Sequence, residues 1–149
     1  MARSTADLPS VIALRVLIVD DHLAVRRVFC DFLQERREFI VVGEAADGLE
    51  AIAQARALSP DVVLMDISMP NMNGIEATRR LCKELPRLHI LGLSSQLWPE
   101  PVHPIQEVGA AGYFVKGVDT ARLIDYLLAI HARLAVGPSA PLPLVATVT

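Results

Sequence analysis

The sequence lacks a long uninterrupted apolar segment, although 52% of its 149 residues are hydrophobic and its mean hydropathy is +0.40. A membrane-spanning helix needs about 18 or more consecutive apolar residues. Arg15 interrupts the first apolar run, and Asp125 and Arg133 interrupt the last one. The first ten residues also lack the charged and then apolar pattern of a secretory signal. We therefore expect a cytoplasmic protein that makes no contact with a membrane.

Positive charge is sparse, because lysine and arginine form no dense run and the net charge is −3. Nucleic-acid binding relies on clustered cations, so no nucleic acid contact by this segment is expected. A glycine-rich phosphate loop of the G-x-x-x-x-G-K type is also missing, which excludes that mode of phosphate binding. The only two cysteines, Cys30 and Cys82, fall on apolar stripes of expected helices. We interpret them as small buried hydrophobes, with a disulfide or a metal role as the alternative.

Short apolar runs alternate with helical patterns, which is typical of a parallel sheet with helices on both faces. Five strands are predicted, at 14–19, 39–44, 61–65, 88–93 and 111–115. The first helix is predicted from apolar residues at helical spacing, namely Val25, Val28, Phe29, Phe32 and Leu33. Further helices are predicted at 48–58, 74–85 and 120–135, two of them capped by Asp47 and Asp119. The fold class is therefore α/β, a doubly wound five-stranded parallel sheet.

Three prolines crowd the segment in which the fourth helix should begin, Pro99, Pro101 and Pro104. Proline inside a helix costs about 3 kcal/mol, so this helix is predicted to start at or near Pro104 and to be short. After Val136 the composition shifts to glycine, proline, serine and alanine, as in a linker. We therefore predict a flexible leader at 1–12, one domain at 13–136 and a linker-like or disordered tail at 137–149.

Carboxylates stand at the ends of two predicted strands. Asp20 and Asp21 close the first apolar run, and Asp66 closes the run that begins at Val62. Buried strands of this kind deliver their acids to one edge of the sheet. Like charges at close range raise one another's pKa, and a hard cation such as Mg²⁺ removes that cost because it takes oxygen ligands and shares them with phosphate. The arrangement indicates phosphoryl chemistry.

Two further strand ends carry polar side chains, Ser94 with Ser95 after the fourth strand and Lys116 after the fifth. Ligands of doubly wound sheets bind outside the carboxyl ends of the strands. Taken singly, these residues have simpler explanations, since serine after a strand often caps a helix and a lone lysine is usually solvated. Their occurrence together, in this order, favours a site. His22, beside the acids, is interpreted as a helix-start residue because magnesium prefers oxygen ligands.

Four motifs extend this pattern: Leu17-Ile18-Val19-Asp20-Asp21-His22, Asp66-Ile67-Ser68-Met69-Pro70-Asn71-Met72-Asn73-Gly74, Leu91-Gly92-Leu93-Ser94 and Gly109-Ala110-Ala111-Gly112-Tyr113-Phe114-Val115-Lys116. With them, about residues 14–135 resemble the receiver domains of bacterial two-component response regulators, in particular the branch often fused to a LuxR-type helix-turn-helix. The resemblance implies a flavodoxin-like strand order of 2-1-3-4-5. It also implies a phosphorylation-dependent signalling switch of a phosphorelay, and not an enzyme that turns over an external substrate.

The resemblance assigns Asp66 as the phosphoacceptor, which receives its phosphoryl group from a sensor histidine kinase or a phosphotransfer protein. It implies Mg²⁺ as the cofactor, held by Asp20, Asp21, Asp66 and the backbone carbonyl of Ser68. Phosphoryl transfer requires mainly positioning and charge neutralisation. Lys116 would accordingly contact a phosphoryl oxygen, and Ser94 would donate its hydroxyl to the acyl phosphate.

The same resemblance implies Ser94 and Tyr113 as the switch pair. The added phosphoryl charge attracts the serine hydroxyl, and the ring of Tyr113 then fills the vacated space and reshapes the face of the fourth helix, fifth strand and fifth helix. A plain core aromatic is the alternative for Tyr113. The chain departs from the family at Leu23, at Gly117 and at the proline-rich start of the fourth helix. Because the last departure alters the output face, a monomer or a weak homodimer is expected, with an unknown downstream effector.

Other interpretations compete with the phosphorylated receiver. A pseudo-receiver used only for protein binding would have lost an acid or the lysine, and all are present. A dehalogenase-type phosphohydrolase requires Asp-x-Asp, whereas Asp20-Asp21-His22-Leu23 occurs here. A further alternative is the regulatory receiver half of a DNA-binding transcription factor, cut at its linker. Arg26 and Arg27 on the first helix are candidates to contact a kinase, or plain solvated charges.

Overall fold

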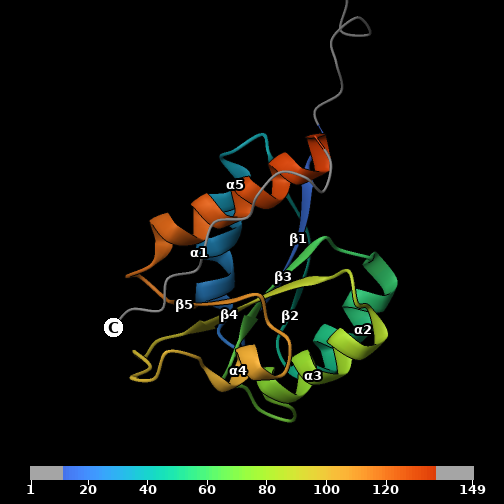
Figure 1. Cartoon of the computed structure of the whole chain (residues 1–149). Helices are drawn as coiled ribbons and strands as arrows, with labels where there is room; N and C mark the ends of the chain where they lie inside the picture. The colour runs from blue at the N-terminus through green and yellow to red at the C-terminus, as the bar shows by residue number, and fades with distance from the viewer. Residues whose placement is uncertain (1–11, 137–149) are drawn as a thin grey trace, which may run out of the picture.

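A central sheet lies between two layers of helices in the computed structural model of the protein, which describes residues 12–136 (Figure 1). Apart from Ile12, the predicted leader at 1–12 and tail at 137–149 lie outside the described residues. The strands are β1 (Leu14–Val19), β2 (Phe39–Ala45), β3 (Val62–Asp66), β4 (His89–Ser94) and β5 (Gly112–Val115). The helices are α1 (Leu23–Gln34), α2 (Gly48–Leu58), α3 (Gly74–Glu84), α4 (Pro104–Glu107) and α5 (Thr120–Val136).

The five strands are parallel and lie in the order β2-β1-β3-β4-β5, which confirms the predicted doubly wound sheet and its order. Strand order reverses between β1 and β3, and ligands of such sheets bind at this point, outside the carboxyl ends of the strands. Asp66 and Ser94 are the last residues of β3 and β4, one position later than the predicted strand ends. The sheet therefore carries both side chains to the edge at which a ligand is expected.

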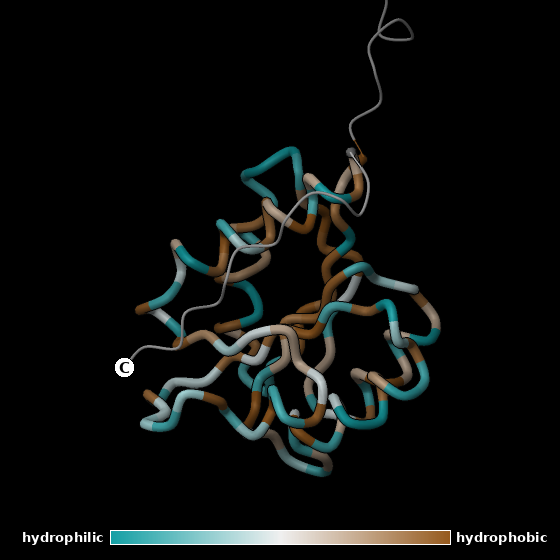
Figure 2. The backbone as a smooth tube through the Cα atoms, in the orientation of Figure 1, coloured by the Kyte–Doolittle hydropathy of each residue, from teal (hydrophilic) through white to brown (hydrophobic). Residues whose placement is uncertain are grey.

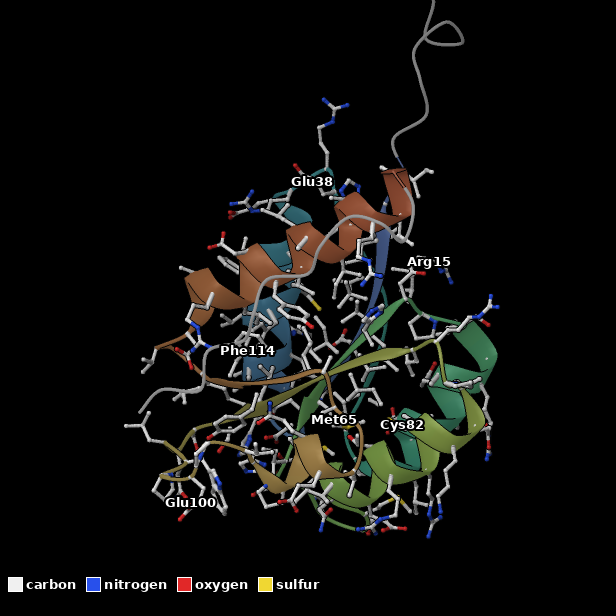
Figure 3. All side chains as sticks on the ribbon, viewed as in Figure 1. Arg15, Glu38, Met65, Cys82, Glu100 and Phe114 are labelled. Carbon is white, nitrogen blue, oxygen red and sulfur yellow. The ribbon has the colours of Figure 1, made fainter. Side chains whose placement is uncertain are left out.

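Each face of the sheet has its own apolar core, because side chains of successive strand residues point to opposite faces. Val16 and Ile18 of β1 pack with Phe114 into the core beneath α1 and α5, whereas Leu17 packs with Met65 into the core beneath α2 and α3. In Figure 2 hydrophobic residues gather in the middle of the molecule, where the sheet lies, and Figure 3 shows Phe114 and Met65 on their respective sides. Burial on both faces explains why the strands are continuous apolar runs.

Helix starts follow the predicted capping residues. The Asp47 carboxylate accepts a hydrogen bond of 2.8 Å from the Glu50 N–H at the start of α2. Asp119 directly precedes α5. Its carboxylate accepts a hydrogen bond of 2.8 Å from the Val115 N–H, which ties the β5–α5 loop to the end of β5. Helix α4 begins at Pro104 and has four residues, as the prolines before it predict.

Three apolar residues lie less deep than the sequence pattern suggests. Val28 of α1 is 66% exposed and lines a groove between α1 and the start of α5. Cys30 and Cys82 are free thiols in half-buried positions, and burial raises the pKa of each. Within residues 12–136, no helix is long and apolar enough to cross a membrane.

Candidate functional site

Two buried carboxylates meet at the carboxyl edge of the sheet. Asp20 follows β1, where its backbone N–H continues the strand pairing by donating to the Ala45 carbonyl at 3.0 Å, and its side chain is 2% exposed. Asp66 ends β3, next to β1, and is 5% exposed. Asp20 Oδ1 also accepts a hydrogen bond of 2.8 Å from the His22 N–H. The sequence prediction that strand order brings these acids together is confirmed by their shared partner, Lys116.

Lys116 supplies the positive charge that these carboxylates need. Its Nζ donates to Asp20 Oδ2 at 2.6 Å and to Asp66 Oδ1 at 3.0 Å. Its backbone N–H donates to the Ser94 carbonyl at 2.8 Å, which extends the β4–β5 pairing by one residue and fixes the start of the side chain. A buried charge is tolerated when it is paired and hydrogen-bonded. One ammonium thus bridges the acids of two strands.

The ionisation of the site reflects burial and crowding together. Burial raises the pKa of Asp66 to about 6, the hydrogen bond and charge of Lys116 act against this rise, and Asp20 and Asp21 add to it. Burial acts to lower the pKa of Lys116, but hydrogen bonds and charge from Asp20 and Asp66 outweigh it, and the pKa is raised. The lysine is therefore charged at neutral pH, and the pKa of Asp66 lies below neutral pH.

The third carboxylate leaves an unsatisfied acceptor at the site. Asp21 Oδ1 is buried and accepts no hydrogen bond of good geometry within the described part of the chain, although His22 Nδ1 lies 3.2 Å away. Two of the three carboxylates, Asp20 and Asp66, contact the single ammonium of Lys116, so negative charge is in excess. A buried oxygen without a donor and surplus negative charge fit a hard divalent cation. Ligand atoms of Asp20, Asp21 and His22 lie within 4.8 Å of one another, so the geometry also offers an imidazole nitrogen.

The loop after Asp66 is held in place from several sides. The Gly74 N–H donates to the Ile67 carbonyl at 2.9 Å, and a Cβ on Gly74 would lie 2.1 Å from the Asp66 carbonyl oxygen. Asn71, with φ at 65°, donates from Nδ2 to Asp47 Oδ2 at 2.8 Å, and the Gly48 N–H donates to the Met72 carbonyl at 2.9 Å. The β3–α3 loop is thereby tied to the first turn of α2. Ser68 lies in this loop and is exposed.

Ser94 and Tyr113 are joined through the backbone of Gln96. The Gln96 N–H donates to Ser94 Oγ at 3.1 Å, and the Tyr113 hydroxyl donates to the Gln96 carbonyl. The ring of Tyr113 stacks on His103, which itself is 5% exposed. Sequence reasoning missed both Gln96 and His103. Gln96 acts through its main chain and so leaves no sequence signal, whereas a histidine directly before a proline at a helix start is a weak signal for a cap.

The two arginines of α1 differ in their surroundings. Arg26 donates from Nη1 to the Asp20 carbonyl at 2.6 Å and from Nε to Glu44 Oε1 at 3.0 Å, and its side chain is 15% exposed. Arg27 is exposed. Arg26 therefore fixes α1 to the end of β1, a structural contact that the helical pattern did not predict. His22 precedes α1 directly, as predicted for a helix-start residue.

A doubly wound sheet of this order with buried acids bridged by a lysine at the strand-order reversal defines a phosphoryl-accepting signalling domain. Residues 16–128 match the response regulator receiver domain family, and the chain belongs to that family. The family match and the fold therefore confirm the resemblance seen in the sequence.

Known proteins similar to this chain are regulators of the same family. The transcriptional regulatory protein LiaR of Bacillus subtilis is 42% identical over 116 residues, which are 78% of this chain and 55% of LiaR. A LuxR-family two-component response regulator from Aurantimonas sp. superposes with a TM-score of 0.71 at 34% identity, over 87% of this chain and 91% of its own. A chain of the CheX–CheY complex with BeF3 and magnesium from Borrelia burgdorferi gives a TM-score of 0.67 at 26% identity, over 84% of this chain and 90% of its own length. The chain spans about half the length of the curated relatives it matches.

Proposed function

We propose that Asp66 accepts a phosphoryl group from a sensor histidine kinase or a phosphotransfer protein in the cytoplasm. The observation that carries this assignment is the 3.0 Å contact between Asp66 Oδ1 and Lys116 Nζ at the carboxyl edge of the sheet. Asp66 is the buried acid at the end of the strand next to the order reversal, and its loop is fixed by Gly74 and Asn71. A rigidly placed carboxylate beside a cation is what phosphoryl transfer requires.

In the proposed reaction a carboxylate oxygen of Asp66 bonds to phosphorus, and the bond from phosphorus to the donor's histidine nitrogen breaks. The nitrogen keeps the electron pair, and the product is an acyl phosphate on Asp66. The nucleophile must be ionised, and with a pKa raised by burial to about 6 the carboxylate form of Asp66 predominates at pH 7 and above. Lys116 faces the developing charge on the phosphoryl oxygens, and Ser94 donates its hydroxyl to one of them.

We propose Mg²⁺ as the cofactor, with Asp20, Asp21, Asp66 and the Ser68 backbone carbonyl as its protein ligands. The buried, unsatisfied Asp21 Oδ1 and the excess of negative charge support this set. When bound, the ion neutralises charge on the transferred group. His22 is left out because its side chain is 71% exposed and magnesium prefers oxygen.

The change in Asp66 is proposed to reach the surface through Ser94 and Tyr113, onto the face of α4, β5 and α5. The Gln96 backbone, which contacts both side chains, supports this route. Because the protein alters its own covalent state, we propose a signalling role and not the turnover of an external substrate. The intact set of acids and lysine favours this role over a pseudo-receiver.

Intact-mass measurement after incubation with acetyl phosphate and Mg²⁺ tests the assignment. We expect the added mass of one phosphoryl group on the wild-type chain and none on Asp66→Asn, with Asp31→Asn on the exposed side of α1 as the matched control. Removal of Mg²⁺ with EDTA should abolish labelling. Because a receiver that reacts only with its kinase gives no label, binding of BeF3 in the presence of Mg²⁺ is followed in parallel by ¹⁹F NMR.

Two results would reject the assignment. Equal labelling of the wild type and Asp66→Asn would place the phosphoryl group elsewhere. Absence of both the label and bound BeF3 on the wild type would make the site incompetent for phosphoryl chemistry.

A further inference from the structure

His103 is a buried polar residue in the proline-rich β4–α4 loop, and it caps α4. Its Nδ1 accepts a hydrogen bond of 3.0 Å from the Ile105 N–H, and its own N–H donates to Gln106 Oε1 at 2.9 Å. This reciprocal pair is a capping box, with histidine in the place usually taken by serine or threonine. Because Nδ1 accepts, the imidazole is neutral and carries its proton on Nε2.

The ring of His103 contacts two other aromatic rings. It stacks on Tyr113, with 4.4 Å between ring centroids and 13° between planes. It also meets the ring of Trp98 in a tilted contact, with 4.6 Å between centroids and 59° between planes, and the Trp98 Nε1–H donates to the Val102 carbonyl at 3.2 Å. The stack therefore joins β5, the start of α4 and the loop that precedes it.

This stack is continuous with the contacts that reach the phosphorylation site. The Tyr113 hydroxyl donates to the Gln96 carbonyl, and the Gln96 N–H donates to Ser94 Oγ at 3.1 Å. The backbone carbonyl of Ser94 accepts from Lys116, whose ammonium contacts Asp66. Tyr113 cannot move its ring without giving up its stacking with the residue that caps α4.

We propose that His103 is a positioning residue for Tyr113, and that it converts a change in the position of that ring into a change at the N-terminus of α4. The inference rests on the proposed function, in which phosphorylation of Asp66 acts on Ser94 and Tyr113. The device uses one side chain twice: its ring face positions Tyr113, and its Nδ1 holds the first turn of α4. Coupling of this kind is reciprocal, so a substitution that removes the ring stacked on Tyr113 must also alter the affinity of the site for its anion.

NMR provides a direct test, because the chain has one tryptophan and so one indole N–H signal. The ¹⁵N-labelled wild-type protein is titrated with BeF3 in the presence of Mg²⁺, while ¹⁹F NMR reports whether BeF3 is bound. We expect both the Trp98 indole signal and the Ile105 amide signal to shift with the same midpoint as BeF3 binding. This arm needs no variant and therefore does not depend on a mutant that folds.

Two substitutions separate the functions of the side chain. His103→Asn keeps an acceptor that can cap α4 but removes the ring, whereas His103→Phe keeps a ring and removes the acceptor. We expect His103→Asn to change the apparent affinity for BeF3 by roughly two- to tenfold, because the loss of one aromatic ring pair has an effect of this size. It should also abolish the shift of the Ile105 amide. His103→Phe should bind BeF3 with nearly the wild-type affinity.

The outcomes distinguish this inference from the proposed function. If ¹⁹F NMR shows bound BeF3 while the Ile105 amide of the wild type does not respond, the inference is wrong and the proposed function stands. A wild-type affinity and amide response in His103→Asn would likewise overturn it. If no BeF3 binds to the wild type, the proposed function fails and this inference fails with it.

Discussion

Lys116 holds Asp66 across an intervening strand. The lysine follows β5 and the aspartate ends β3, with β4 between them, and their 3.0 Å contact spans this distance because the lysine side chain reaches over the end of β4. The Asp66 carboxylate and the Lys116 ammonium are therefore positioned by different strands, β3 and β5, and the pairing of both strands with β4 fixes their separation.

Substitution of Lys116 by methionine should destabilise the protein in the absence of Mg²⁺. The change removes the ammonium that contacts two buried carboxylates, and loss of one partner of a buried ion pair costs about 3 kcal/mol or more. Urea unfolding at pH 7.5 in EDTA measures this loss, and Mg²⁺ should restore part of it. Lys83→Met, at an exposed position of α3, is the matched control. Equal effects of the two substitutions would contradict the pairing.

The effect of Asp66→Asn on stability should depend on pH. In the folded protein burial raises the pKa of Asp66 to about 6, whereas an unfolded aspartate titrates near ~3.9. The folded state thus binds more protons between these values, so ionisation of Asp66 costs stability as the pH rises through this window. Asparagine does not titrate, and the variant should gain roughly 1–3 kcal/mol over the wild type above pH ~7.

The same gain should shrink as the pH falls through this window and approach zero below pH ~3, where Asp66 is protonated in both states. Urea unfolding in EDTA at several pH values follows the difference between the two proteins. Asp31→Asn at the surface of α1 provides the reference for a carboxylate that is not buried. A gain of constant size across the range would show that Asp66 is not the titrating group.

Gly74→Ala should destabilise the protein although alanine favours helices. The new Cβ would lie 2.1 Å from the Asp66 carbonyl oxygen, which is backbone and cannot rotate away. Overpacking of this kind costs about 1–3 kcal/mol, and it should also displace Asp66 and slow its labelling. Helix propensity alone predicts a gain of about 1 kcal/mol, so the sign of the change in melting temperature decides between the two effects.

Gly117→Ala is the comparison for this substitution. Gly117 has φ of 77° and no atom within 4 Å of a Cβ, so alanine there meets strain of the left-handed backbone and no clash. We expect a loss of about 1–2 kcal/mol from that strain alone.

Thr78→Val should stabilise the protein. Thr78 of α3 is fully buried, and within residues 12–136 its hydroxyl has no hydrogen-bond partner. Valine has nearly the same shape and carries no polar group, so it should raise the free energy of unfolding by about 1 kcal/mol. Thr78→Ser keeps the hydroxyl and removes the methyl group, and it should lower stability by a similar amount. A lower melting temperature for Thr78→Val would reveal a partner for the hydroxyl.

Local signals in the sequence were sufficient for the elements of the fold. Four of the five strands are apolar runs that end in, or directly before, an acid, a serine or a lysine, and the start of α4 at Pro104 follows from the backbone restriction of proline. The meeting of Asp20, Asp66 and Lys116 was also predictable, because parallel strands bring their carboxyl ends to one edge.

Contacts that depend on tertiary packing were not predictable. His103 is polar and stands next to a proline, and it becomes buried because β5 places Tyr113 against it. Val28 fits the apolar spacing of α1 but lies at the rim of the helix stripe, where the start of α5 leaves it 66% exposed. Periodicity identifies the buried face of a helix, and the neighbouring elements decide where that face ends.

Two loops form the walls of the candidate site, the β3–α3 loop and the β4–α4 loop. Hydrogen bonds of Asn71 and Met72 join the first of these loops to the start of α2. One wall, the β3–α3 loop with Asp66, is secured by α2. The other wall, the β4–α4 loop, carries the aromatic stack. Substitutions around α2 therefore act first on the wall that holds Asp66, while substitutions around α4 act first on the wall that carries the stack. The two walls draw their support from separate stretches of the sequence, so mutations far apart along the chain can reshape either side of the site.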